Sequence, residues 1–143
     1  MTEEMCHKLM DATPDAVMIA DRQGVICYWN DAAVRIFGFS HDEAIGSSLD
    51  LIIPEPLRKR HWEGYRRVME CGVTSYGDRL LSVPGITRQG DRISLEFSVA
   101  LLKDGKGGII WCGAILRDVT SRWEREREIE RRLSECESKQ NPQ

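Results

Sequence analysis

One histidine of the sequence is placed where it could bind a metal. His61 lies in a predicted helix over residues 54–71, in which apolar or aromatic positions recur every three or four residues: Leu57, His61, Tyr65, Val68 and Met69. This spacing places the imidazole on the apolar face of the helix. A neutral imidazole there can bind a metal through one ring nitrogen if the other is held. A core histidine that is hydrogen-bonded to a strand fits the same pattern, so both interpretations stand.

The other reactive residue types form no recognisable centre. The five cysteines contain no C-x-x-C pair, and their odd number argues against a disulfide framework or a zinc site. We expect reduced thiols, with Cys27 and Cys112 buried in strands and unreactive. Phosphate-binding loops, nucleophile elbows and facing carboxylate pairs are missing from the sequence, which predicts that the chain is not an enzyme.

The first half of the chain is predicted to alternate short helices with a hairpin. Apolar runs over 16–20 and 25–29 flank a turn that contains Gly24, which is typical of two paired strands. Asn30 can cap a helix that Gly38 ends, and Ser40 can cap a short helical piece that stops at Gly46. Pro54 and Pro56 introduce the helix that carries His61.

The second half is predicted to be sheet. Strand candidates cover 74–83, 92–103 and 108–119, and the middle one alternates apolar residues with Ser94, Glu96 and Ser98. The linkers 88–91 and 104–107 are rich in turn residues, so the strands should be antiparallel neighbours. The fold class is therefore α+β, a five-stranded antiparallel sheet with short helices on one face. The space between the two layers could hold a small molecule.

Length and charge limit the class of protein. The 143 residues correspond to about one domain, and the composition of 41% hydrophobic and 30% charged residues is that of a globular protein. A net charge of −3 argues against a nucleic-acid partner. No apolar run is long enough for a membrane span, and the N-terminus is too polar for a signal peptide, so we expect a cytoplasmic protein without membrane contact.

Charge is concentrated near the C-terminus. Twelve of the nineteen residues from 121 to 139 are charged, which predicts an exposed helix with a narrow apolar stripe that includes Trp123, Ile129 and Leu133. Such a stripe suits either pairing with a second copy or a solvated terminal helix. The chain then divides into an N-terminal flanking helix (1–12), a central domain (13–120) and a C-terminal helix and tail (121–143). We expect a homodimer through the two flanking helices.

Six short motifs in order resemble those of PAS domains. They are Pro14-Asp15-Ala16, Ala20-Asp21 with Gly24, Tyr28-Trp29-Asn30, Phe37-Gly38-Phe39, Glu43 with Ile45-Gly46, and Arg117-Asp118-Val119-Thr120. The resemblance covers residues 11–120 and implies a sensory or dimerisation module that passes a signal to an effector domain or kinase. It also implies that the final Asp118-Val119-Thr120 couples the last strand to the C-terminal helix.

The helix around His61 resembles that of the haem-binding PAS domains of the FixL family. The resemblance rests on 53–56, Arg60-His61, Tyr65 and Arg67, and it implies that His61 is the axial ligand of haem b and that Arg67 binds a propionate. Leu81 stands where that family has its oxygen-stabilising arginine, and Ser75 replaces a second propionate partner. Arg79 lies on the same strand face two residues earlier and could reach the pocket.

Without Arg79, the distal pocket would be lined by Leu81 and Val99, together with Leu95 or Phe97. An apolar pocket without a hydrogen-bond donor favours carbon monoxide or nitric oxide over oxygen, so the identity of the gas is left open.

Two alternatives to haem binding also remain. One is a non-covalent FAD stacked on Trp62 or Trp111. The other is a cofactor-free PAS domain that serves for dimerisation and signal relay.

Overall fold

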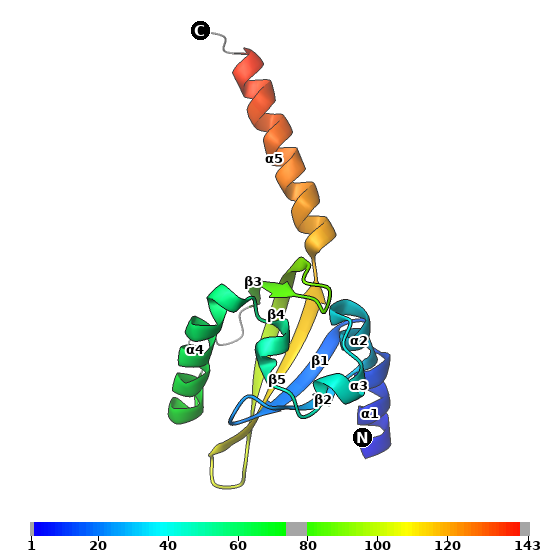
Figure 1. The fold of residues 1–143 in the computed structure, drawn as a ribbon, viewed down its shortest axis with the longest axis vertical. Helices are drawn as coiled ribbons and strands as arrows, with labels where there is room; N and C mark the ends of the chain where they lie inside the picture. The colour runs from blue at the N-terminus through cyan, green and yellow to red at the C-terminus, as the bar shows by residue number, and fades with distance from the viewer. Residues whose placement is uncertain (1, 74–79, 141–143) are drawn as a thin grey trace.

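The computed structural model describes residues 2–73 and 80–140, and Figure 1 shows their arrangement. A sheet carries helices on one face, and a long helix leaves the domain at its end. The elements in chain order are α1 (Glu3–Ala12), β1 (Ala16–Asp21), β2 (Ile26–Trp29), α2 (Asp31–Phe37), α3 (His41–Ala44), η1 (Leu49–Ile52), η2 (Glu55–Leu57), α4 (Arg58–Cys71), β3 (Leu81–Ile86), β4 (Arg92–Lys103), β5 (Ile109–Asp118) and α5 (Thr120–Gln140).

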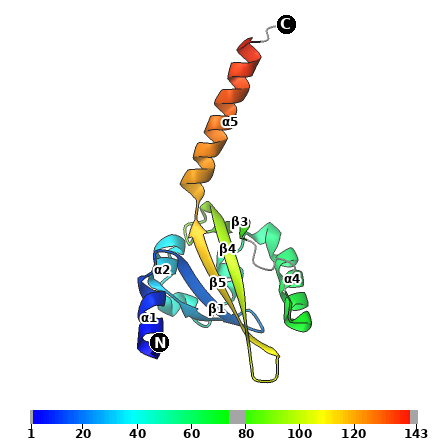
Figure 2. The same ribbon diagram turned by 180° about the vertical axis from the view of Figure 1, so that it is seen from behind.

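The five strands form one antiparallel sheet in the order β2-β1-β5-β4-β3. This confirms the predicted fold class. In register, Phe97 lies opposite Leu116 and Leu116 lies opposite Ala16, so side chains from three strands share one face, which we call the core face. The opposite, outer face carries Glu96, and no described helix crosses it in the rear view of Figure 2.

Asn30 connects the N-terminal helix to the sheet. Its side chain is fully buried, and its Oδ1 accepts hydrogen bonds from the amides of Val17 (2.9 Å) and Ala33 (3.0 Å). Its Nδ2 donates to the carbonyls of Met10 (2.7 Å) and Asp15 (3.0 Å). The predicted helix cap is therefore confirmed. The same side chain also joins α1, β1 and α2, because a buried amide needs all of its donors and acceptors satisfied.

The helix boundaries follow the predicted capping chemistry. Gly38 ends α2 and Gly72 ends α4, both in the left-handed conformation (φ 84° and 75°) that glycine adopts without strain. Ser40 and Glu43 form a reciprocal capping box at the start of α3. The helix expected from Pro54 begins instead with the short turn η2, and regular α-helix starts at Arg58.

The third predicted strand is displaced along the chain. We expected it over 74–83, whereas β3 runs Leu81–Ile86; residues 74–79, with Ser75 and Arg79, lie outside the described part of the chain. Pro84 directly follows the predicted strand but lies within β3. It fits in β3 because this strand forms an edge of the sheet, where a residue without an N–H is tolerated.

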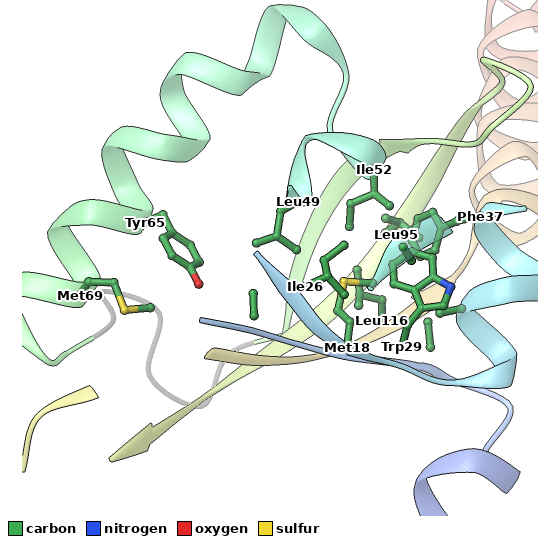
Figure 3. Close-up of a cluster of buried hydrophobic side chains, with 14 of the residues drawn as sticks. Met18, Ile26, Trp29, Phe37, Leu49, Ile52, Tyr65, Met69, Leu95 and Leu116 are labelled. Carbon is green, nitrogen blue, oxygen red and sulfur yellow. The ribbon is translucent and has the colours of Figure 1, made fainter. Parts of the chain in front are cut away.

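The core lies between the sheet and the short helices. Its largest fully buried side chains include Trp29, Phe37, Met18 and Ile26, which Figure 3 shows in one cluster with Leu95. These residues come from β1, β2, α2 and β4, so the centre of the domain is closed by packing. The α4 helix stands at one end of this cluster in Figure 3.

The last helix is attached to the sheet at its first turn. The hydroxyl of Thr120 accepts a hydrogen bond from the amide of Ser94 (2.9 Å), and the amide of Val119 donates to the carbonyl of Ser94 (2.8 Å). Arg122 forms an ion pair with Glu96 on β4. Beyond this turn α5 projects away from the domain in Figures 1 and 2. Within the described residues, no helix has both the length and the hydrophobicity needed to cross a bilayer.

Candidate functional site

The inward face of α4 carries three large side chains one turn apart. Tyr65 and Met69 are buried, Trp62 is half-buried against the core, and Tyr65 and Met69 point from the helix toward the sheet in Figure 3. His61 is half-buried at the edge of this face. The predicted apolar face is thus present, but it is centred on Trp62, Tyr65 and Met69 rather than on His61.

The His61 ring lies against two aromatic rings. Its centroid is 4.8 Å from the Trp62 ring in an edge-on arrangement and 5.8 Å from the Tyr65 ring. Burial lowers the pKa of His61, and the nearby carboxylate of Asp50 opposes this shift only in part, so the neutral imidazole is favoured. A neutral ring is the form that binds a metal.

One nitrogen of this ring has no partner. Nδ1 of His61 is buried, and no described residue donates to it or accepts from it. A buried polar atom without a partner costs about 1–3 kcal/mol, and it is rare in folded proteins. The interpretation of His61 as a core histidine hydrogen-bonded to a strand therefore finds no such bond in the described residues. An incoming ligand could supply the missing partner.

Two hydrogen bonds fix the aromatic neighbours of His61. The indole N–H of Trp62 donates to Asp50 Oδ1 (2.7 Å), and the Tyr65 hydroxyl donates to the backbone carbonyl of Asp21. Trp62 also packs on Gly24, where a Cβ would lie 2.1 Å from the indole ring. These contacts tie α4 to η1 and to the turn between β1 and β2.

A hollow of about 410 Å³ opens between α4 and this turn. Its lining consists of Arg22, Gln23, Trp62, Tyr65 and Arg66. Arg22 spans one side of the hollow, because its guanidinium donates to the carbonyls of Ile109 (2.6 Å) and Met69 (3.4 Å). The hollow is therefore bounded by aromatic rings and cationic groups.

The structure brings together only part of the predicted site. His61 and Tyr65 are neighbours, whereas Arg67 is exposed and does not line the hollow. Leu81, Leu95, Phe97 and Val99 share the core face of β3 and β4, where Leu81 lies opposite Phe97 in register. None of these four residues lines the hollow. Arg79 lies outside the described residues.

Sequence reasoning missed Arg22, Gly24 and Asp50, and it considered Trp62 only as a flavin-stacking residue. The spacing of Trp62, Tyr65 and Met69 is also helical, and it offered a signal for the true inward face. Arg22 and Asp50 carry no such signal. Their contacts with Ile109 and Trp62 join distant parts of the chain.

The exposure of Cys27 and Cys112 tests the prediction that both thiols are buried. Cys27 is exposed rather than buried, because it is the extra residue at a bulge in the edge strand β2, between Tyr28, which pairs with Ile19, and Ile26, which pairs with Ala20. Cys112 is half-buried on the core face, and burial raises the pKa of its thiol to about 11. Of the two tryptophans considered for flavin stacking, Trp111 is exposed on the outer face, whereas Trp62 packs against the core. Among the described residues, no group of three His, Cys, Asp or Glu side chains could hold a metal ion; a haem iron would need only one.

Comparison with known proteins establishes the class of this fold. The family described as "PAS fold" matches residues 10–124, and the chain belongs to this family. The solved PAS domain of a Colwellia psychrerythraea protein superposes with a TM-score of 0.72 at 19% identity, over 82% of this chain and 97% of that one. An RNA-binding Light-Oxygen-Voltage receptor superposes with a TM-score of 0.72 at 18% identity, over 92% of this chain and 37% of that one.

Two curated relatives are sensor proteins. The chain is 30% identical to the "Sensor protein FixL" of Bradyrhizobium diazoefficiens, over 95% of this chain and 26% of that protein. It is 30% identical to the "Oxygen sensor protein DosP" of Escherichia coli, over 73% of this chain and 13% of that protein. The chain therefore spans about a quarter or less of the length of these relatives, and its resemblance to FixL extends beyond the helix of His61.

Proposed function

We propose that this chain is the sensory PAS domain of a signal-transduction protein, and that it binds haem b through His61. The observation that carries the proposal is the buried, unpartnered Nδ1 of His61 on the helix whose sequence resembles the haem-binding PAS helix. A haem held by one histidine would supply an iron that can bind a diatomic gas or change its redox state. His61 would hold the iron, and Tyr65, whose ring lies 5.8 Å from the imidazole, would hold that ring in place.

The proposed gas pocket is lined by side chains of β3 and β4. Leu81, Leu95, Phe97 and Val99 are apolar and offer no hydrogen-bond donor to a gas. Arg79 belongs to the proposed site as the residue that could supply one. A pocket without a donor favours carbon monoxide or nitric oxide, whereas a donor favours oxygen.

The proposed relay runs through the last strand into α5. Asp118 Oδ1 accepts hydrogen bonds from the amide (3.0 Å) and the hydroxyl of Thr120, and Thr120 is in turn bonded to Ser94 on β4. A displacement of β4 or β5 would therefore act directly on the first turn of α5. If this first turn has two conformations, a ligand that binds one of them better increases the population of that conformation.

The effector is proposed to lie elsewhere in a longer protein. The matched region makes up 26% and 13% of the lengths of the two sensor relatives, which supports the role of an input domain within a longer protein. We propose that the domain acts in the cytoplasm as a homodimer and signals to an effector domain or kinase.

Haem titration tests the proposal. Untagged protein, with haemin added in steps, should develop one Soret band that saturates at one haem per chain. His61→Ala should lose the band while keeping its circular dichroism spectrum, and His7→Ala, an exposed histidine on α1, should keep both. The absence of a saturable band in the wild-type protein would contradict the haem proposal and would favour a cofactor-free PAS domain.

A further inference from the structure

Two ion pairs lie side by side on the outer face of the sheet, next to the start of α5. Arg117 on β5 donates two hydrogen bonds to the carboxylate of Asp15 (3.0 and 3.1 Å). Glu96 on β4 lies opposite Arg117 in register and forms an ion pair with Arg122 on α5. Asp15, Glu96 and Arg117 also line one hollow of about 180 Å³. The two pairs therefore join the segment before β1 to the first turn of α5.

Glu96 has a second cation within reach. Residues directly opposite each other in an antiparallel pair have Cβ atoms about 4.5–5.5 Å apart, so the Arg117 side chain can reach Glu96. The Glu96 side chain is only 16% exposed and lies within a strand, so it cannot turn fully into water. A carboxylate that is largely covered is costly to leave unpaired. When Arg122 moves away, Glu96 therefore attracts Arg117.

The two outer members of this set can change partner or turn to water. Arg122 Nε lies 3.8 Å from Glu126 Oε1, one turn further along α5, so Arg122 keeps a carboxylate when the helix leaves the sheet. Asp15 lies outside regular structure, in the short segment between α1 and β1, so its side chain can turn to solvent. Arg117 can therefore exchange Asp15 for Glu96 without breaking the sheet.

We propose that Arg117 and Glu96 form an exchange latch that couples the docking of α5 to the attachment of α1. With α5 docked, Glu96 binds Arg122, and Arg117 binds Asp15. When α5 moves away, Arg122 binds Glu126, Arg117 binds Glu96, and the segment that follows α1 is released. The latch extends the proposed relay to the N-terminal helix and rests on the proposed function for its role in signalling. The exchange itself needs no haem, because a ligand has only to favour one of the two arrangements.

Hydrogen exchange of α1 in the haem-free full chain tests the latch. The amides are followed by mass spectrometry, at a concentration at which light scattering gives all variants the same mass. Arg122→Gln removes the cation from Glu96, and Asp15→Asn breaks the contact with Arg117 directly. Arg125→Gln is the control, since Arg125 is exposed on the same helix and forms no ion pair with another described residue.

A double variant separates partner exchange from a simple loss of contact. Arg122→Gln and Asp15→Asn should each speed the exchange of α1 about two- to fivefold, as expected for an ion pair at the surface, whereas Arg125→Gln keeps the wild-type rate. Glu96→Gln combined with Arg122→Gln should restore a rate close to the wild type, because Glu96 then no longer competes for Arg117.

Three results would overturn the latch. They are an unchanged α1 in Arg122→Gln, an unchanged α1 in Asp15→Asn, and a double variant that exchanges as fast as Arg122→Gln alone. All of these measurements use haem-free protein, so their outcome is independent of the haem titration. A failed haem titration would leave the latch intact, and a failed latch would leave the haem proposal intact.

Discussion

His61 is held in a way that costs stability in the absence of a ligand. Its Nδ1 is buried without a partner in the described part of the chain, next to the rings of Trp62 and Tyr65. A histidine that served only the core would be expected to use this nitrogen in a hydrogen bond. Groups that destabilise the free protein and gain partners on binding are typical of functional sites.

This cost predicts an unusual effect of a core substitution. His61→Leu should raise the free energy of unfolding of the haem-free protein by about 0.5–2 kcal/mol, because leucine fills similar space without a polar atom. Urea unfolding, followed by circular dichroism, measures the change. A loss of stability of about 1 kcal/mol or more would mean that the imidazole has a structural partner, and it would support the core-histidine interpretation.

Cys112 should be protected from modification by the raised pKa of its thiol as well as by burial. Its pKa of about 11 leaves only a very small thiolate fraction at pH 8, and the thiolate is the reactive form. The exposed thiols of Cys71 and Cys136 should therefore react first with a disulfide reagent, as mass mapping would show. The rate at Cys112 should rise about tenfold per pH unit from 8 to 10 while the fold persists. Equal rates for all three thiols would contradict the environment described for Cys112.

At the scale of elements, the contact between α4 and the β1–β2 turn defines the candidate site. Gly24→Ala should disrupt this contact, because the added methyl group would meet the Trp62 ring at 2.1 Å and because Gly24 has a φ of 81°. Gly46→Ala is the matched control, since Gly46 has a φ of 90° but no atom within 4 Å of the added Cβ. We expect Gly24→Ala to cost about 1–3 kcal/mol more than Gly46→Ala in urea unfolding. Equal losses would show that Trp62 does not depend on Gly24.

Elements were predictable where local chemistry determines them. The caps at Asn30 and Ser40 and the stop at Gly38 depend on residues that are neighbours in the chain, and the alternating pattern of β4 shows directly which residues lie on each of its faces. The bounds of β3 were not predictable locally, because the strand includes Pro84, which is tolerated only at a sheet edge, and the edge position depends on the strand order.

The candidate site was less predictable than the fold. The sequence predicts an inward face of α4 that is centred on His61, one residue from Trp62, which lies on the observed face. Contacts such as Arg22 to Ile109 and Trp62 to Gly24 join segments that are distant in sequence. The residue types and positions of Arg22 and Gly24 in a turn do not predict which distant residues they contact. The helical period of α4 fitted both a face centred on His61 and one centred on Trp62, and tertiary packing selected the second.

At the scale of the whole molecule, α5 is the element that can connect this domain to others. It projects from the sheet, and Trp123, Ile129 and Leu133 are about half exposed along it (45%, 51% and 59%). Ion pairs such as Arg131 with Glu128 and Glu135 support the helix on its own surface. Its apolar residues remain available for a partner.

Removal of α5 should lower the mass of the protein in solution. We expect a dimer for the full chain and a monomer after deletion of residues 121–143, measured by light scattering coupled to size exclusion. Ile129→Asp with Leu133→Asp should have the same effect without shortening the chain, because two buried carboxylates would oppose pairing. A truncated protein that stays dimeric would place the dimer contact in α1 or on the sheet.

The central claim is that His61 itself holds a haem, and a cavity variant tests it most directly. His61→Gly removes the side chain, and free imidazole can then take its place. We predict that this variant, with haemin added, shows no Soret band of bound haem until imidazole is supplied, and that the band then approaches that of the wild-type protein. A His61→Gly variant that binds haemin as tightly as the wild type without imidazole would contradict the account.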